Sequence, residues 1–182
     1  MTLLILDIEL PKKGIVTSGE LLLSLGKILP EIINYSMTFL LLAIFWIIHI
    51  HQIRMIKNTD RIHLILNFFF LFFITIFPFS TSLLGDFPDL YASEAIFHFN
   101  VFAAYFFAYI QWHYAISKKD FLKEDVTKEE IALETKKNRI LLIIPLIITI
   151  IGLLTPILSS VLFLSVPFVL LYLNKKGKKQ NV

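Results

Sequence analysis

Residues 39–50, FLLLAIFWIIHI, and residues 64–79, LILNFFFLFFITIFPF, are apolar runs separated by the polar turn HQIRMIKNTDRIH at residues 51–63. Neither run alternates apolar and polar residues, as the strands of a membrane barrel do. The helix is the other structure that satisfies its own backbone hydrogen bonds in lipid. The two runs therefore predict a transmembrane helical hairpin, and the rest of the chain is placed relative to it.

The composition of the chain argues against a soluble domain, a disulfide-bonded protein and an enzyme. Hydrophobic residues make up 57% of the 182 residues, charged residues make up 17%, and the mean hydropathy is +0.75. A soluble domain has about 25% charged residues. The absence of cysteine rules out disulfides and thiolate chemistry. The sequence also shows no nucleophile–base set and no phosphate-binding glycine loop, so we expect neither an enzyme nor a bound cofactor.

The whole chain predicts an all-α fold, a polytopic membrane bundle forming a single domain over residues 1–182. The expected helices cover about residues 1–10, 30–51, 63–84, 92–116, 140–155 and 159–173. The first is truncated, because its length of about 15 Å is half of a bilayer core. Residues 20–29 form either an interfacial helix or the first turns of the next span. A re-entrant pair is the alternative for residues 140–173.

Small and polar residues mark one face of the expected helix at residues 92–116. They are Asn100, Ala104, Ala108 and Gln111. Such residues let membrane helices approach closely and form hydrogen bonds with each other. We therefore expect this face to lie inside the bundle.

Residues 118–139 predict a charged cytoplasmic linker, which we interpret as a solvated helix. Two ion pairs at helical spacing fit this interpretation, Glu124 with Lys128 and Glu134 with Lys137. Most of the 17 lysines and arginines lie in the turn at residues 51–63, in this linker and in the C-terminal tail. Basic loops stay in the cytoplasm, so we expect a multi-pass protein of the cell membrane with a cytoplasmic C-terminus and no nucleic-acid partner.

Several motifs, taken together in their order, resemble the lysosomal potassium channel family (transmembrane protein 175 family), in its prokaryotic single-repeat branch. They are Thr2-Leu3-Leu4-Ile5-Leu6-Asp7-Ile8, Trp46-x-x-His49, Asn67-x-x-Phe70-Leu71-Phe72-Phe73, Pro78-Phe79-x-Thr81-x-Leu83-Leu84-Gly85, and Asn100 with Trp112-x-Tyr114-Ala115.

The resemblance implies six helices per repeat and a homotetramer, with the first helix of each subunit lining a central pore. The implied partners are potassium, other monovalent cations and membrane lipid. Thr2 then resembles a pore-facing threonine and Leu6 an apolar ring one turn further out. A hydroxyl can replace part of an ion's hydration shell, and a leucine ring narrows the path. The alternative interpretation of both residues is ordinary lipid-facing or packed positions.

The sequence departs from the family pattern at two places. The family's first helix opens with R-x-x-x-F-S-D, which is absent before Thr2, and the W-x-x-H-H of the second helix has Ile50 between His49 and His51. We expect an upstream start codon rather than a shortened paralogue. A paralogue of that kind gives the alternative function, a non-conducting membrane protein or assembly partner. A transporter is a weaker third class, because no acid or base lies deep in any expected span.

The remaining polar residues have a functional and a structural interpretation. Asp7 and Glu9 could concentrate cations at the pore mouth, and the alternative is solvated acids at the membrane interface. His49 and His113 lie at similar depth, but we expect structural packing rather than haem. We expect Glu94 and His98, one turn apart, to form a surface hydrogen bond rather than a pH-sensitive pair. The residues expected to give structural polar support are Trp46, His49, Asn67 and Asn100.

Overall fold

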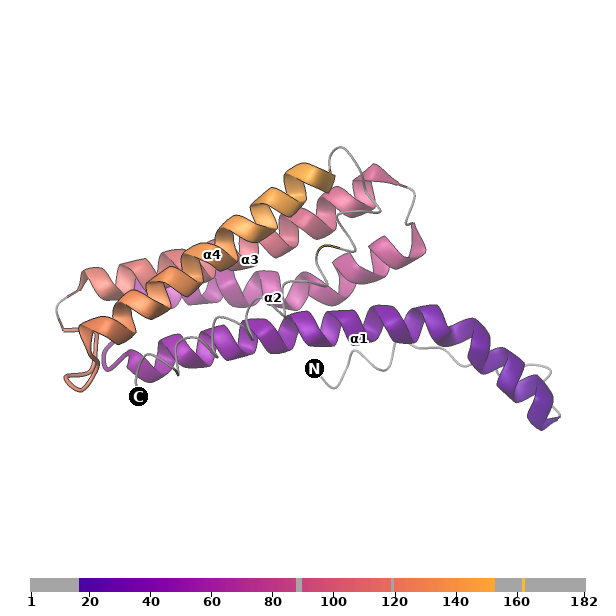
Figure 1. Cartoon of the computed structure of the whole chain (residues 1–182), viewed down its shortest axis with the longest axis horizontal. Coiled ribbons are helices and arrows are strands. Elements are labelled where there is room, and N and C mark those ends of the chain that lie inside the picture. The colour runs from indigo at the N-terminus through magenta and orange to yellow at the C-terminus, as the bar shows by residue number, and fades with distance from the viewer. Residues whose placement is uncertain (1–16, 88–89, 119, 153–161, 163–182) are drawn as a thin grey trace.

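The computed structural model describes residues 17–87, 90–118, 120–152 and 162. Within these residues the chain folds into long helices and has no β-strand (Figure 1). The helices are α1 (Ser18–Met55), α2 (Arg61–Asp86), α3 (Tyr91–Ser117) and α4 (Lys128–Gly152). The all-α prediction is confirmed for this part of the chain. The arrangement of six helices stays a prediction, because residues 1–10 and most of residues 153–173 lie outside the described residues.

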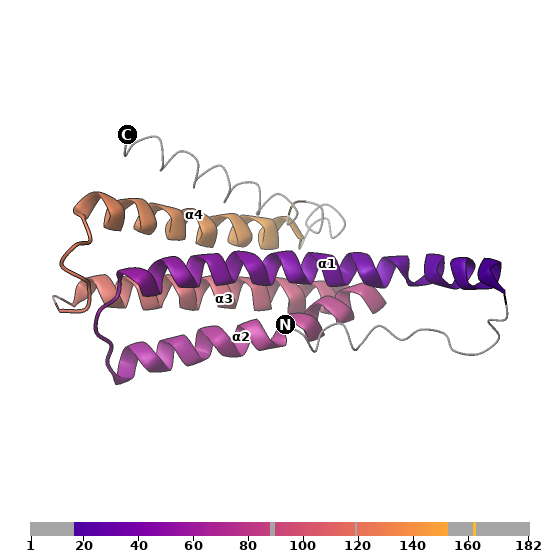
Figure 2. The ribbon, with the colours of Figure 1, turned by 90° about the horizontal axis from the view of Figure 1, so that it is seen from below.

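Helix α1 begins at a capping box that the sequence encodes directly. The Glu20 backbone N–H donates to the Thr17 hydroxyl at 3.2 Å, and the Thr17 backbone N–H donates to the Glu20 carboxylate at 2.9 Å. The helix then continues without a break to Met55. The helix therefore begins before the expected residue 30. Of the two interpretations of residues 20–29, the first turns of the next span is confirmed and the separate interfacial helix is wrong. Figures 1 and 2 show this early part of α1 extending beyond the other described helices.

Helix α2 contains the whole of the expected helix at residues 63–84. Asp60 caps its first turn by accepting the His63 backbone N–H at 2.9 Å. Pro78 lies inside the helix, where proline removes one backbone hydrogen bond. The hydroxyls of Ser80 and Thr81 both donate to the Phe77 carbonyl, at 3.0 and 2.8 Å. These bonds satisfy both hydroxyls inside the apolar helix.

Helix α3 is the most buried of the described helices and packs against α2 and α4. Its expected inner face is confirmed, because Asn100, Ala104, Ala108 and Gln111 are all buried. Alanines on this face leave room for large neighbours, including Phe45 of α1, whose ring centroid is 4.4 Å from that of Tyr105. The core therefore forms around α3.

Helix α4 begins inside the predicted linker and corrects it. A second capping box, in which the Glu130 backbone N–H donates to the Thr127 hydroxyl at 3.2 Å, precedes the helix that starts at Lys128. The residues buried along α4 are Glu134, Asn138, Leu141, Pro145, Ile148 and Gly152. They follow one helical stripe that starts in the charged segment and continues into the apolar one. The linker is therefore only partly solvated and ends before residue 128.

The ion pairs predicted for the linker have different outcomes. Glu134 and Lys137 form their pair, with 3.7 Å between the carboxylate and the ammonium group. Glu124 lies before α4 and bonds Lys57 of the α1–α2 turn at 3.2 Å, instead of the predicted partner Lys128. Both members of this second pair are exposed, and such pairs contribute about 0–1 kcal/mol.

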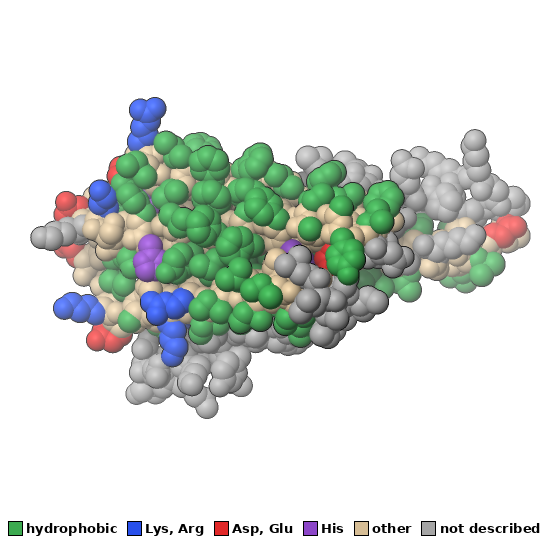
Figure 3. Space-filling view, turned by 90° about the horizontal axis from the view of Figure 1, so that it is seen from above, with side chains coloured by type: hydrophobic (Ala, Val, Ile, Leu, Met, Phe, Trp, Pro, Cys, Tyr) green, Lys and Arg blue, Asp and Glu red, His purple; other side chains and the backbone are tan. Residues whose placement is uncertain are grey.

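The α1–α2 turn and the α3–α4 connection meet at the same end of the bundle (Figure 1). The backbone N–H of Lys57 donates to the Phe121 carbonyl at 2.7 Å, and that of Lys123 donates to the Met55 carbonyl at 3.0 Å. Charged side chains gather at this end, whereas hydrophobic side chains cover most of the face seen in Figure 3. The two basic segments that the charge pattern places on one side of the membrane are thus adjacent.

Two of the described helices are long and apolar enough to cross a membrane. They correspond to residues Thr38–Met55 of α1 and to the whole of α2, Arg61–Asp86. Only 17% of the α2 span is buried inside the structure. A helix this apolar with so much exposed surface requires lipid or another protein around it.

Candidate functional site

The predicted pore residues lie outside the described part of the chain. Thr2, Leu6, Asp7 and Glu9 all belong to residues 1–16. Their roles therefore stay predictions, and the site that can be described is the interior of the bundle that follows them.

Trp46 and His49, one turn apart on α1, occupy different environments. His49 is buried and stacks on Phe70 of α2, with 5.0 Å between the ring centroids. Trp46 is 58% exposed, and its ring centroid is 6.5 Å from that of His49. The expected first helix, at residues 1–10, is outside the described residues, so whether Trp46 and His49 contact it stays untested. The exposed indole leaves a large amphipathic surface on this side of α1.

The two predicted asparagines also differ. The Asn100 side-chain N–H donates to the Ser80 hydroxyl at 3.1 Å, which joins α3 to α2 inside the core. The side-chain oxygen of Asn67 and the Nε2 atom of His63 are buried, and neither has a hydrogen-bond partner among the described residues. These two residues are four apart on α2, so they share one helical face. An unpaired buried polar atom costs about 1–3 kcal/mol, which makes this face of α2 a place for an additional polar partner.

A polar network that the sequence did not predict connects three helices. The Gln52 amide of α1 donates to the Asn138 side-chain oxygen of α4 at 2.9 Å and to the Ala108 carbonyl of α3 at 3.2 Å. The Gln52 side-chain oxygen accepts from the Gln111 amide of α3 at 2.9 Å. Gln52 is almost fully buried, and all of its hydrogen-bonding groups are used. The side-chain oxygen of Gln111, by contrast, is buried without a hydrogen-bond partner among the described residues. The buried hydrogen bonds of Gln52 fix how α1, α3 and α4 lie against each other.

The network extends to a titratable group at each end. On α1, the Nδ1 atom of His49 is 3.4 Å from the Gln111 amide nitrogen. On α4, the Asn138 amide donates to the Glu134 carboxylate at 3.3 Å, and Glu134 also pairs with Lys137. Burial raises the pKa of Glu134 above its ordinary value, while the Lys137 ammonium group opposes the shift. A carboxylate therefore lies at the point where α4 joins α1 and α3.

A sequence signal for this network exists in retrospect. Gln52 sits at the edge of the basic turn, and Glu134 and Asn138 sit in the charged linker, so each looks solvated when read alone. Glu134 and Asn138 are four residues apart, and Leu141 continues the same stripe. Extending the apolar stripe of α4 backwards at a period of 3.6 residues would have placed both inside the bundle.

The structure corrects the predicted position of the Glu94–His98 pair. Glu94 and His98 are predicted to form a surface hydrogen bond, but both are buried, with 3.8 Å between the carboxylate and Nε2. They line a cavity of about 170 Å³ with Tyr91 and Thr149 among the other lining residues. The prediction of a surface position is wrong because α4 covers this part of α3.

His49 and His113, the pair considered for haem, have separate neighbours. His49 stacks on Phe70, whereas the His113 ring centroid lies 4.3 Å from that of Tyr109. No group of three or more potential metal-ligating side chains gathers within the described part of the chain.

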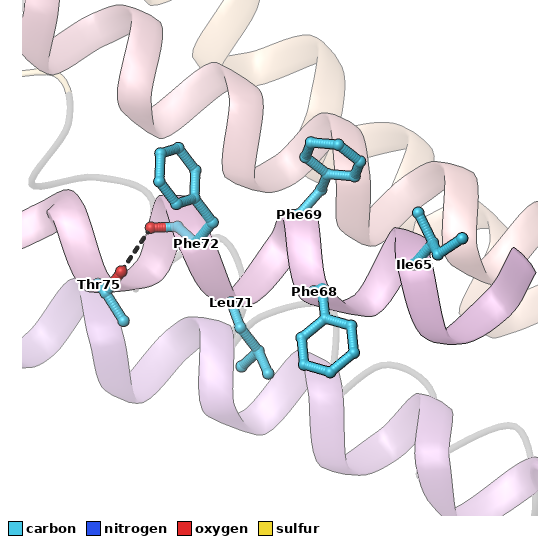
Figure 4. A pocket seen from close by; sticks show the side chains of 6 residues that line it. All are labelled: Ile65, Phe68, Phe69, Leu71, Phe72 and Thr75. Carbon is cyan, nitrogen blue, oxygen red and sulfur yellow. Dashed lines mark hydrogen bonds between the residues drawn. The ribbon is translucent and has the colours of Figure 1, made fainter. Parts of the chain in front are cut away.

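Helix α2 carries an apolar groove of about 520 Å³ on its surface (Figure 4). The residues that line it all come from α2 and are Ile65, Phe68, Phe69, Leu71, Phe72 and Thr75. The Thr75 hydroxyl donates to the Phe72 carbonyl at 2.7 Å, so the one polar lining group is satisfied within the helix. The groove is suited to an acyl chain or to an apolar side chain of a neighbouring helix.

Residues 1–78 of the chain match the family model described as the endosomal/lysosomal potassium channel TMEM175. Two relatives are named potassium channels. One, from Chamaesiphon minutus, is 26% identical over 144 residues, which cover 76% of this chain and 70% of that protein. The other, from Streptomyces collinus, is 32% identical over 87 residues, which cover 48% of this chain and 41% of that protein.

The matched region covers α1 and most of α2, including Trp46, His49 and Asn67. The matched segment also contains His63 and Asn67, whose buried polar atoms have no partner among the described residues. It contains Gln52, at the centre of the polar network, as well. The resemblance of this chain to the TMEM175 potassium channel family is therefore confirmed over its first 78 residues.

Proposed function

We propose that the chain is a subunit of a potassium-conducting cation channel that works by passive transport. The match of residues 1–78 to the TMEM175 potassium channel family carries this proposal, and two relatives with potassium channel names support it. The family is one of ion channels and not of enzymes. The two long apolar helices and the apolar outer surface are consistent with a membrane protein.

In the proposed channel, four copies surround a central pore lined by the first helix of each copy. Thr2 and Leu6 face the ions, and Asp7 and Glu9 lie at the pore mouth. The chain crosses the membrane six times, with its C-terminus in the cytoplasm. The adjacent positions of the basic α1–α2 turn and the basic α3–α4 connection support this orientation, because basic loops stay on the cytoplasmic side.

The buried network has a mechanical role in this proposal. Helix α1 follows the proposed pore segment in the chain, and Gln52 connects α1 to α3 and α4 near the cytoplasmic end. A fixed α1 holds the residues before it at a constant distance from the pore axis. The network therefore positions the pore without contacting the ions.

Potassium flux into liposomes that contain the purified chain tests the function. We expect flux from the unmodified chain and a larger or less selective flux from Leu6→Ala, because the smaller side chain widens the apolar ring. Leu64→Ala, at an exposed position of α2, is the matched control and should leave flux unchanged. Folded, reconstituted protein without any flux would contradict the proposal and favour a non-conducting membrane protein.

A further inference from the structure

The cavity of about 170 Å³ that Glu94 and His98 line lies between the first turns of α3 and the last turns of α4. Its lining residues fall within residues 91–102 of α3 and residues 146–152 of α4. Figure 1 shows these parts of the two helices at the end of the bundle opposite to the charged connections. Because a water molecule occupies about 30 Å³ in the liquid, the cavity has room for a small ion together with bound water.

The polar wall of this cavity is formed by two side chains of α3, one helical turn apart. Glu94 and His98 are 3% and 2% exposed, and the Glu94 carboxylate oxygen lies 3.8 Å from the His98 Nε2 atom. Two ligand atoms that hold one tetrahedral ion at about 2.0–2.1 Å are about 3.4 Å apart. The two side chains are thus close to the spacing of a shared ion, and a small rotation of either side chain closes the difference.

The chemistry of these two groups selects the class of ion. An imidazole nitrogen together with a carboxylate oxygen suits Zn²⁺ and related transition metals, whereas Mg²⁺ and Ca²⁺ prefer oxygen ligands alone. Residues at i and i+4 face the same side of a helix, and this is also the spacing of the two zinc-binding histidines in H-E-x-x-H. Burial strengthens the attraction between the Glu94 carboxylate and a cation, because the local dielectric constant is low.

Other residues around the cavity provide a partner for bound water and a route to the surface. The Thr149 hydroxyl of α4 donates to the Pro145 carbonyl at 2.8 Å, so its oxygen can still accept a hydrogen bond from a metal-bound water. Tyr91, the first residue of α3, lines the same cavity and is 62% exposed. The cavity is therefore within reach of the surface at this end of the helix.

We propose that Glu94 and His98 bind one divalent transition-metal ion of the Zn²⁺ class in this cavity, with water completing its coordination. Two protein ligands leave coordination positions open, unlike a structural zinc site with four protein ligands. In the orientation proposed above, the site lies on the side of the membrane opposite to the basic connections. This inference goes beyond the proposed function and holds whether or not the chain conducts ions.

Calorimetric titration of the untagged chain in detergent micelles with ZnCl₂ tests the site. The sequence contains no cysteine, so no thiolate competes for the ion. We expect saturable zinc binding, which Glu94→Gln and His98→Gln should each weaken by about tenfold or more. His113→Gln removes the other histidine of α3 and is the matched control, which should bind zinc as the unmodified chain does. No saturable binding, or equal affinity in all four proteins, would overturn the proposal.

A fourth variant, Glu94→His, separates metal binding from a purely structural role of the pair. Two histidines at i and i+4 also bind zinc, so this variant should bind it at least as tightly as the unmodified chain. Glu94→Gln is closer to glutamate in shape, yet it should bind zinc less tightly than Glu94→His. Because both variants alter the same buried position, this order reports the ligand rather than the packing. Zinc binding by Glu94→His that is no tighter than by Glu94→Gln would overturn the proposal.

Discussion

The neighbouring helices α2 and α3 differ in which side chains they bury: α2 exposes most of its apolar side chains, whereas α3 buries polar ones. Of the two candidate membrane spans, in α1 and α2, the one in α2 is the more apolar. Its mean hydropathy is 2.2, yet only 17% of it is buried. Helix α3 contains Glu94, His98, Asn100 and Gln111, and all four are buried. In a bilayer the surroundings are as apolar as leucine, so burial follows polar and small residues rather than hydrophobic ones. The predictions below test this difference, from the largest expected effect to the smallest.

The largest effect is expected at Trp112 of α3. Its side chain is fully buried, and the indole N–H donates to the Thr135 hydroxyl of α4 at 2.9 Å. Trp112→Ala should lower the free energy of unfolding by about 3–5 kcal/mol, because it leaves a cavity. Phe68→Ala on the exposed face of α2 should change it by less than about 0.5 kcal/mol. Thermal unfolding in detergent micelles measures both, and similar losses would contradict the contrast between the helices.

The next effect concerns the Gln52 network. Gln52→Leu should lower the free energy of unfolding by about 1–3 kcal/mol, because it leaves polar groups of Gln111 and Asn138 buried and unpaired. Combining it with Asn138→Leu should cost less than the sum of the two single changes, because the two residues share one hydrogen bond. Ile53→Leu, at the exposed neighbouring position, is the control. Strict additivity would show that the two side chains do not interact.

A smaller effect is expected from the titration of Glu134. Because burial raises its pKa, its contribution to stability is present below the ordinary carboxyl pKa of 4.5 and is lost as the pH rises through the raised value. Unfolding of the unmodified chain should therefore become easier over that interval. Glu134→Gln cannot titrate and should remove this part of the pH dependence. A pH series of thermal unfolding curves on both proteins measures the difference, and identical curves would refute it.

The smallest effect is expected at Asp60, which joins the two compared helices. The His63 backbone N–H and then the Tyr114 hydroxyl of α3, at 2.6 Å, lower the pKa of Asp60. Its contribution to stability is thus present above the ordinary pKa of 3.8 and is lost as the pH falls through the lowered value. Asp60→Asn should weaken this acid sensitivity, and Tyr114→Phe should weaken it less. The acid limb of the unfolding curve decides whether the order holds.

The parts of the fold that could be predicted from the sequence are those in which neighbouring residues have the same hydrophobic character. The positions of α2 and α3 follow from continuous apolar runs with clear ends, and the inner face of α3 follows from the spacing of its alanines and amides. The start of α4 could not be predicted from composition, because Lys128 and its charged neighbours suggest solvent. The burial of this part of α4 depends on one helical face, because Glu134 and Asn138 point inward while the lysines around them remain at the surface.

The candidate site also contains residues that the sequence predicted and one that it did not. Asn100 and His49 were predicted as polar support and are buried with partners, because polar residues within apolar runs have few alternatives to an inward position. Gln52 was not predicted, because the end of α1 continues past the point where the basic turn was expected to begin. Its hydrogen bonds run to residues 56 and 86 positions away, and no local pattern contains that information.

The amino-acid sequence by itself determined that this is a helical membrane protein with its basic connections on one side, and it contained the family resemblance. Those properties depend on hydrophobic length and charge, which are local. Only the tertiary structure decided that α3 lies at the centre of the described helices, that Gln52 connects three of them, and that α1 begins at Ser18 and extends beyond the others. These depend on which helical faces meet, and that is fixed by the packing of side chains distant in the chain.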